Sequence, residues 1–239
     1  SQVPSSPAAS AAPSAPRDGW VRCAHLSPNS PPMDIYMYPF GLASNPTVLR
    51  HVSYGSVSEY MAVSPGQYSV AIRAAGAPAS AVPLISTSFT VSAGTAYTVA
   101  GIGPVSGVRL ETLKDQMTVP MGKALVRVIQ ASLKNFSVTV SYGPNVLARQ
   151  LAFGPATSYL AVSPSSNMVQ FDASNGHTAM SVKFAADTVH TIVVLDGSSG
   201  LKVDALTDAV GSKMMPMGGV NTGFGGTEPR PSPADPVPW

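Results

Sequence analysis

The sequence predicts an all-β protein built from two tandem antiparallel β-sandwich domains. Three observations carry this prediction: a long internal repeat, an apolar period of two within each copy, and glycine and proline clusters that separate short apolar runs. Only 11% of the 239 residues are charged, whereas soluble domains usually carry about 25%. Long helices with an exposed Lys- and Glu-rich face are therefore not expected.

The repeat consists of three blocks that occur in the same order in both halves. VRCAHLS from Val21 corresponds to VRVIQAS from Val126, and YGSVSEYMAVSP (54–65) corresponds to FGPATSYLAVSP (153–164). The third block pairs TAYTVAGIGPVSGVRLETLKD (95–115) with TVHTIVVLDGSSGLKVDALTD (188–208). We therefore divide the chain into an N-terminal Ser/Ala/Pro-rich segment (1–19), a first sandwich (20–115), a linker (116–123), a second sandwich (124–210) and a Gly/Pro-rich tail (211–239).

Strands are indicated by strict alternation of apolar and polar residues. The apolar members of two such runs, which should face the cores, are Tyr68, Val70 and Ile72 in the first copy and Phe136, Val138, Val140 and Tyr142 in the second. Val21 and Cys23 should face inward with Arg22 outward, and the second copy repeats this pattern around Arg127. Pro65-Gly66 and Pro144-Asn145 are predicted hairpin turns.

Seven or eight short strands per copy are expected, with turn signals roughly 8–12 residues apart. This spacing favours an antiparallel, immunoglobulin-like sandwich. The two terminal segments should be disordered or extended, because they contain too little apolar surface to offset the entropy of ordering.

The first copy carries the segment VRCAHLSPNSPPMDIYM (21–37), then YGSVSEYMAVSPGQYSV, then a strand that ends in VRLETLKD. This pattern resembles domain of unknown function 4397. The resemblance covers nearly all of 20–115 and is weaker over 124–210, where the Pro-rich opening has become SLKNFSVTV. It implies a bacterial, more narrowly actinobacterial, exported or cell-surface protein, often with tandem copies, and it implies no particular activity.

The repeat also offers a test for catalytic residues, because a site inherited from an ancestral domain should be present in both copies. His25 lies opposite Gln130, His51 opposite Gln150, and His190 opposite Tyr97. The spacings of zinc sites and the G-x-S-x-G nucleophile elbow do not occur, and the acidic residues are scattered singly. We therefore expect no enzyme, with no catalytic, cofactor-binding or metal-binding residues.

Three further features have structural interpretations. Cys23 lies opposite Val128, which indicates a small buried apolar residue and not a reactive thiol. Asp115 and Asp208 correspond to each other at a strand end, where turn or capping hydrogen bonds are expected. Tyr60 and Tyr159 are expected to be paired core or interface aromatics.

The candidate contacts for a ligand or partner lie in and after the Pro-rich loop 27–34: Asn29, Asp34 and Tyr36. Asn29 and Asp34 could hold a cation or a sugar hydroxyl. The alternative, which we favour, is that Asp34 accepts hydrogen bonds from loop amides. In the C-terminal tail, Asn221, Thr222 and Gly223 form an N-T-G sequence that faintly resembles part of a sortase anchoring signal.

Composition narrows the function class. A net charge of +2 without basic clusters gives no footprint for nucleic acid. The sequence contains no apolar run long enough for a membrane span, so we expect any membrane anchor to lie beyond Trp239. The single cysteine excludes an internal disulfide, and the Ser/Ala/Pro-rich start is typical of an exported protein after removal of its signal peptide.

The leading hypothesis is therefore a non-enzymatic extracellular or cell-envelope protein with a structural or adhesive role, whose partner is another protein or a cell-wall component. One alternative is an extracellular module that binds carbohydrate or another small ligand. The other is an accessory subunit of a surface assembly. The oligomeric state and the angle between the domains are left open.

Overall fold

The alternating segments form strands that assemble into four sheets. The computed structural model describes residues 17–40, 45–154, 156–198, 200–210 and 215–216. Within those ranges, the helical element is a single three-residue turn, and no helix is long and apolar enough to cross a membrane. The all-β prediction is confirmed.

The first sandwich has two four-stranded sheets, with strand orders β4-β1-β7-β8 and β3-β2-β5-β6. Its elements are β1 (Gly19–Leu26), β2 (Met33–Pro39), β3 (Thr47–Val52), β4 (Met61–Val63), β5 (Gly66–Ala74), β6 (Ile85–Val91), β7 (Ala96–Ile102), the 3-10 helix η1 (Val105–Gly107) and β8 (Arg109–Asp115).

The second sandwich repeats this layout, with strand orders β12-β9-β15-β16-β17 and β11-β10-β13-β14. Its elements are β9 (Ala124–Gln130), β10 (Val138–Tyr142), β11 (Asn145–Leu151), β12 (Leu160–Val162), β13 (Ser165–Ala173), β14 (Gly176–Phe184), β15 (Thr188–Gly197), β16 (Gly200–Val210) and β17 (Met215–Pro216). The first four strands of its five-stranded sheet correspond in order to those of β4-β1-β7-β8. The duplication seen in the sequence is thus a duplication of topology.

The sheets are not purely antiparallel. β1 pairs with β7 in parallel, and β9 pairs with β15 in the same way. Parallel strands are usually buried on both faces and read as nearly continuous apolar runs. Every residue of β7 and β9 is buried, which fits their central place in a layered molecule. The antiparallel prediction therefore holds for most strand pairs but is wrong for these two.

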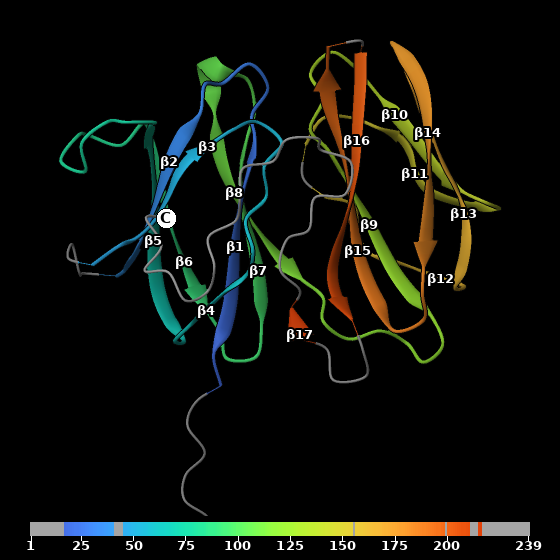
Figure 1. The fold of residues 1–239 in the computed structure, drawn as a ribbon, viewed down its shortest axis with the longest axis horizontal. Coiled ribbons are helices and arrows are strands. Elements are labelled where there is room, and N and C mark those ends of the chain that lie inside the picture. The colour runs from blue at the N-terminus through green and yellow to red at the C-terminus, as the bar shows by residue number, and fades with distance from the viewer. Residues whose placement is uncertain (1–16, 41–44, 155, 199, 211–214, 217–239) are drawn as a thin grey trace, which may run out of the picture.

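The four sheets form layers (Figure 1). The sheets β4-β1-β7-β8 and β12-β9-β15-β16-β17, here called the inner sheets, face each other across the boundary between the sandwiches. The outer sheets, β3-β2-β5-β6 and β11-β10-β13-β14, lie on the two far sides. Each sandwich has its own apolar core between its outer and inner sheet. A third apolar cluster contains residues from both inner sheets.

Most predicted core residues lie in these cores, including Tyr68, Val70 and Ile72. Phe136 is an exception, because it is 84% exposed and precedes β10 by two residues. The Pro65-Gly66 hairpin is also wrong: it joins β4 of the inner sheet to β5 of the outer sheet. The Pro144-Asn145 hairpin is confirmed, since Tyr142 pairs with Asn145 at the end of the β10–β11 ladder.

Candidate functional site

Arg22 and Arg127 sit at equivalent positions on β1 and β9. Neighbouring side chains along a strand point to opposite faces. Val21 and Cys23 pack into the first core, so Arg22 points away from it, as expected. It does not point to solvent, because the second sandwich covers that face. Arg22 is fully buried and Arg127 is 3% exposed. The prediction that Arg22 faces away from the first core is therefore confirmed, but its side chain is buried against the second sandwich and not exposed to solvent.

Both arginines belong to a group of ionisable and hydroxyl side chains buried between the inner sheets, here called the seam cluster. It comprises four residues of the first sandwich and the four equivalent residues of the second: Arg22, Tyr60, Thr98, Asp115, Arg127, Tyr159, Thr191 and Asp208.

Asp115 links the two sandwiches in one half of the seam cluster. Its Oδ1 accepts a hydrogen bond from Arg127 Nη2 of the second sandwich at 2.5 Å. Its Oδ2 accepts from Thr98 Oγ1 and from Tyr60 Oη of its own sandwich, each at 2.6 Å. The carboxylate is therefore held by three donors, of which the charged one comes from the other domain.

Asp208 repeats this arrangement in the opposite direction. Its Oδ1 accepts from Arg22 Nη2 of the first sandwich at 2.7 Å. Its Oδ2 accepts from Thr191 Oγ1 at 2.5 Å and from Tyr159 Oη at 3.2 Å, both within the second sandwich. Each sandwich thus supplies one arginine to its neighbour and receives one in return.

The Nε donors of both arginines are also engaged, whereas Arg22 Nη1 is buried without a hydrogen-bond partner among the described residues. Arg22 Nε donates to Thr98 Oγ1 at 2.8 Å, and Arg127 Nε donates to Thr191 Oγ1 at 3.0 Å. Arg22 lies over the ring of Tyr60, and Arg127 lies over that of Tyr159, each at 4.6 Å from the ring centroid. Such cation–π contacts stabilise a desolvated guanidinium.

Electrostatics keep the cluster ionised in spite of its burial. Burial by itself lowers the pKa of Arg22, but the negative charges of Asp208 and Asp115 outweigh it, so the pKa rises above its ordinary value. Burial likewise opposes ionisation of Asp208, yet Arg22 and Arg127 lower its pKa. Burial raises the pKa of Tyr60 and of Tyr159, so both phenols stay protonated as donors.

Asp115 and Asp208 therefore do not make the predicted turn or capping hydrogen bonds. They are the acceptors of two buried interdomain ion pairs. The seam cluster was also within reach of the sequence, because all four pairs of positions are identical in the two copies.

Next to the seam cluster, the inner sheets meet through apolar side chains. This third cluster contains both members of four equivalent pairs of residues: Ala24 and Ile129, Leu26 and Ala131, Ala100 and Val193, and Ile102 and Leu195. Their burial stabilises the pair of domains by roughly 25 cal/mol for each Å² of apolar surface removed from water.

Tyr54 adds a polar contact at this apolar boundary that the repeat does not duplicate. Its Oη donates to Ala131 O at 2.9 Å and accepts from Asp196 N at 2.9 Å, both in the second sandwich. The equivalent residue of the second copy is Phe153, which lacks the hydroxyl.

We expect Tyr54→Phe to lower the free energy of unfolding by about 1–3 kcal/mol, because the amide of Asp196 loses its acceptor while the ring still packs. Urea unfolding of the purified protein measures the change. Tyr38→Phe is a matched control on an outer sheet and should change stability by less than about 0.5 kcal/mol. Equal effects of the two substitutions would show that the Tyr54 hydroxyl does not join the domains.

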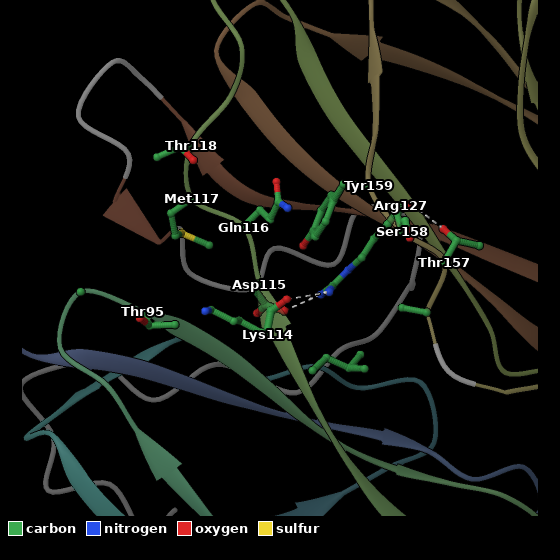
Figure 2. A pocket seen from close by; sticks show the side chains of 13 residues that line it. Thr95, Lys114, Asp115, Gln116, Met117, Thr118, Arg127, Thr157, Ser158 and Tyr159 are labelled. Carbon is green, nitrogen blue, oxygen red and sulfur yellow. Dashed lines mark hydrogen bonds and ion pairs between the residues drawn. The ribbon is translucent and has the colours of Figure 1, made fainter.

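A cleft of about 720 Å³ opens beside the seam cluster (Figure 2). The first sandwich and the linker contribute Lys114, Gln116 and Thr118 to its walls, and the second contributes Ser158 and Tyr159. Figure 2 shows Arg127 reaching Asp115, with dashed lines marking their contact. The cleft thus combines hydrogen-bonding side chains with an aromatic ring at the domain boundary.

The candidate contacts of the Pro-rich loop lie in different environments. Asn29 is exposed in a turn with a φ of 61°, a left-handed conformation that Asn tolerates better than most residues. Asp34 is 1% exposed, and its oxygens accept from His51 N at 2.8 Å and Gly76 N at 3.0 Å. Tyr36 is also 1% exposed and lies under the guanidinium of Arg73. The structure does not gather these three residues around one opening.

His25 has the surroundings of a structural residue. Its Nδ1 accepts from Ser27 N at 3.3 Å, and its Nε2 lies 3.2 Å from Pro31 O. In the second copy, Gln130 Oε1 accepts from Ser132 N and its Nε2 donates to a loop carbonyl. A neutral histidine with its proton on Nε2 and a glutamine present the same acceptor and donor, which explains the replacement between copies.

Burial lowers the pKa of His25, and burial lowers that of His190 as well. As the pH falls below about 6.5, the unfolded chain therefore takes up protons before the folded chain does, and stability falls. We expect His25→Gln to match the wild type near pH 8 and to be the more stable of the two at pH 5. Urea midpoints at both pH values test this, and a difference that is independent of pH would contradict it.

Cys23 is 1% exposed, and burial raises the pKa of its thiol to about 12. It is the small buried apolar residue that was expected. Among the described residues, no group of three or more His, Cys, Asp and Glu side chains is suited to hold a metal ion. The suggested anchoring residues Asn221, Thr222 and Gly223 lie outside the described part of the chain.

Comparison with protein families adds an independent observation. Residues 19–141 match the model of the family described as Domain of unknown function (DUF4397). The chain belongs to this family. The match covers just over half of the 239 residues, and among curated proteins there is no significant match.

The DUF4397 match runs from β1 through the linker and β9 into β10. It thus contains both partners of one interdomain ion pair, Asp115 and Arg127, and the arginine of the other, Arg22. Asp208 lies beyond it. The family description assigns no activity, so the functional argument depends on the geometry of the seam and of the cavities.

Proposed function

We propose that this DUF4397 protein is a non-enzymatic scaffold of the cell envelope or cell surface, in which two sandwiches are held as one rigid structural or adhesive unit. The observation that carries this proposal is the seam cluster. An arginine, a tyrosine and an aspartate that both copies share join the copies, and each of these two carboxylates already has three donors. They are not arranged to act on a substrate.

Rigidity has a physical basis in this arrangement. Interfaces between domains of one chain are commonly polar and allow relative motion. Here, a rotation of one sandwich would separate Arg22 from Asp208, which lies 2.7 Å away across the seam, and breaking a buried ion pair costs several kcal/mol. A fixed pair presents the outer sheets and loops at constant spacing, which suits a structural or adhesive role.

Export and surface location are part of the proposal and rest on the Ser/Ala/Pro-rich composition of residues 1–19. Fractionation of native cells with an antibody tests it directly. Recovery in the envelope or culture medium is the expected result, and recovery in the cytoplasmic fraction would overturn it.

A second candidate function is carbohydrate binding at the seam cleft. Sugars are recognised by hydrogen bonds combined with contact to an aromatic face, and the walls offer Lys114, Gln116 and Ser158 beside Tyr159. A glycan array probed with the chain without its terminal segments separates the two candidates. Saturable, specific binding that is lost in Gln116→Ala would replace the purely structural role, whereas the scaffold proposal expects no such binding.

An accessory subunit of a surface assembly is the remaining alternative. It predicts co-purification with envelope components that depends on residues 214–239. Full-length and shortened chains captured from the same extract distinguish it from the scaffold proposal, which expects the two to behave alike.

A further inference from the structure

A second cavity, of about 380 Å³, opens at one end of the first sandwich. Its walls come from four segments: the Pro-rich segment Ser30–Met33, the end of β5 with Ile72 and Ala74, the start of β6 near Ile85, and η1 with Val108. The cavity lies between the outer and inner sheets of the first sandwich, away from the seam cluster.

The cavity is lined mainly by apolar and uncharged residues. Met33 and Ile72, which are 4% and 1% exposed, belong to the first core, so the cavity reaches that core. At the rim, Leu84 is 68% exposed and Val105 is 56% exposed. No Asp, Glu, Lys, Arg or His is among the described residues that line it. A charged ligand would therefore lose its hydration without a counter-ion.

The second sandwich closes the corresponding end with hydrogen bonds. Asp196 accepts from Ser132 Oγ, Leu133 N and Lys134 N. These bonds hold the loop after β9 against the end of β15. The position equivalent to Asp196 in the first copy is Gly103, whose carbonyl accepts from Ser27 Oγ.

The loop itself has also changed between the copies. The first copy has Pro28, Pro31 and Pro32, which have no amide proton with which to bind a carboxylate. Val105 of the rim corresponds to Ser198 in the second copy. An apolar opening has thus been built at one end of one copy on a framework that the other copy closes with polar contacts.

The hydroxyl of Ser30, which lines the cavity, can accept a hydrogen bond from a ligand. Ser27 Oγ donates its only proton to Gly103 O, so Ser30 Oγ, 2.5 Å from Ser27 Oγ, must be the donor between the two serines. The lone pairs of Ser30 Oγ remain as acceptors at the cavity wall. A ligand that donates one hydrogen bond would complete this chain.

We infer that the first sandwich binds a small uncharged molecule with an apolar ring or branched body and one hydroxyl group, inserted between the Pro-rich segment and η1. The volume sets its size at roughly a dozen non-hydrogen atoms, since a water molecule occupies about 30 Å³ in the liquid. The inference does not depend on the scaffold proposal, because none of these residues belongs to the seam cluster.

The probe we choose is 2-naphthol, which is uncharged at pH 7 and has the required ring and hydroxyl. Its fluorescence during titration with the full chain should show saturable binding with a Kd below 1 mM. Naphthalene, which lacks the donor, should bind about three- to tenfold more weakly, and 2-naphthoate, which is charged, should not bind measurably. Absence of saturation with 2-naphthol, or tighter binding of 2-naphthoate, would overturn the inference.

Two rim substitutions locate the site. Val105→Asp places a charge at the mouth, and since Val105 is exposed the fold should tolerate it, so 2-naphthol binding should fall more than tenfold. Val82→Asp is the matched control, because Val82 is 88% exposed and does not line the cavity. An equal loss in both variants, or no loss in Val105→Asp, would place the probe elsewhere.

Ser30→Ala tests the hydrogen bond separately. It should remove the preference for 2-naphthol over naphthalene and leave naphthalene binding unchanged. A preference that persists in Ser30→Ala would contradict the proposed role of Ser30. These outcomes are independent of envelope fractionation, so failure of this inference and failure of the scaffold proposal can be told apart.

Discussion

Arg22→Met should lower the free energy of unfolding by about 3–5 kcal/mol, the usual cost of leaving one member of a buried ion pair without its partner. Asp208 would keep its hydrogen bonds from Thr191 and Tyr159 but lose the guanidinium that lies 2.7 Å away. Urea unfolding at pH 7 measures the loss. A loss below about 1 kcal/mol would show that the seam cluster does not stabilise the fold.

Arg109→Ala is the matched control, because Arg109 pairs with Glu111 at 3.1 Å while both side chains are substantially exposed. Exposed pairs contribute about 0–1 kcal/mol. The double variant Arg22→Met with Asp208→Leu should be more stable than Arg22→Met alone, because replacing both ions by apolar groups leaves neither member of this pair buried without the other. A double variant less stable than the single would contradict this electrostatic explanation.

The dependence on pH supplies a second signature of the same pair. Burial opposes ionisation of Asp208, but Arg22 and Arg127 lower its pKa in the folded protein. Its contribution to stability is thus complete above about pH 4, where the unfolded carboxyl ionises, and is lost as the pH falls through the folded pKa. In Arg22→Met the folded pKa should rise, so acid should narrow the stability gap between variant and wild type.

The strands were predictable from the sequence because a strand that buries one face has alternating apolar and polar residues. The core positions of β5 follow from that pattern, the two copies follow from the repeated blocks, and the hairpin at Pro144-Asn145 follows from its turn residues. The parallel pairing of β1 with β7 was not predictable in this way. Pairing between strands far apart in the chain depends on how the sheets are layered, and an apolar pattern does not encode it.

The seam cluster shows a second limit of the pattern. Alternation assigns Arg22 correctly to the face opposite Val21, but it cannot say whether water or another domain covers that face. An arginine in a strand is normally taken as exposed. Only its identity with Arg127, together with the identity of Asp115 and Asp208, pointed to a shared buried role.

The reciprocal form of the seam is that of an isologous dimer interface, in which residue i of one subunit contacts residue j of the other and the reverse also holds. Arg22 binds Asp208 and Arg127 binds Asp115, as equivalent residues would across a two-fold axis. The apolar cluster likewise contains equivalent residues from both copies. The covalent linker is therefore not needed to define the geometry of the pair.

Cutting the linker should accordingly leave the two sandwiches together. Met121 is 97% exposed in a turn that precedes β9, so a protease site inserted between Met121 and Gly122 should be accessible without disturbing the fold. After complete cleavage, the two fragments should elute from size exclusion as one species at the mass of the intact chain. Separate elution at micromolar concentration would show that the linker, and not the seam, holds the domains.

Adding Ile129→Asp to the cleavable protein should separate the fragments. Ile129 is 4% exposed within the apolar cluster between the inner sheets, and a carboxylate there would be buried without a partner, at a cost of several kcal/mol. Val146→Asp is the matched control, because Val146 is 39% exposed on an outer sheet. If Val146→Asp also separates the fragments, instability of the second sandwich is the cause. If only Ile129→Asp does, the association depends on the contact between the inner sheets, as the reciprocal geometry requires.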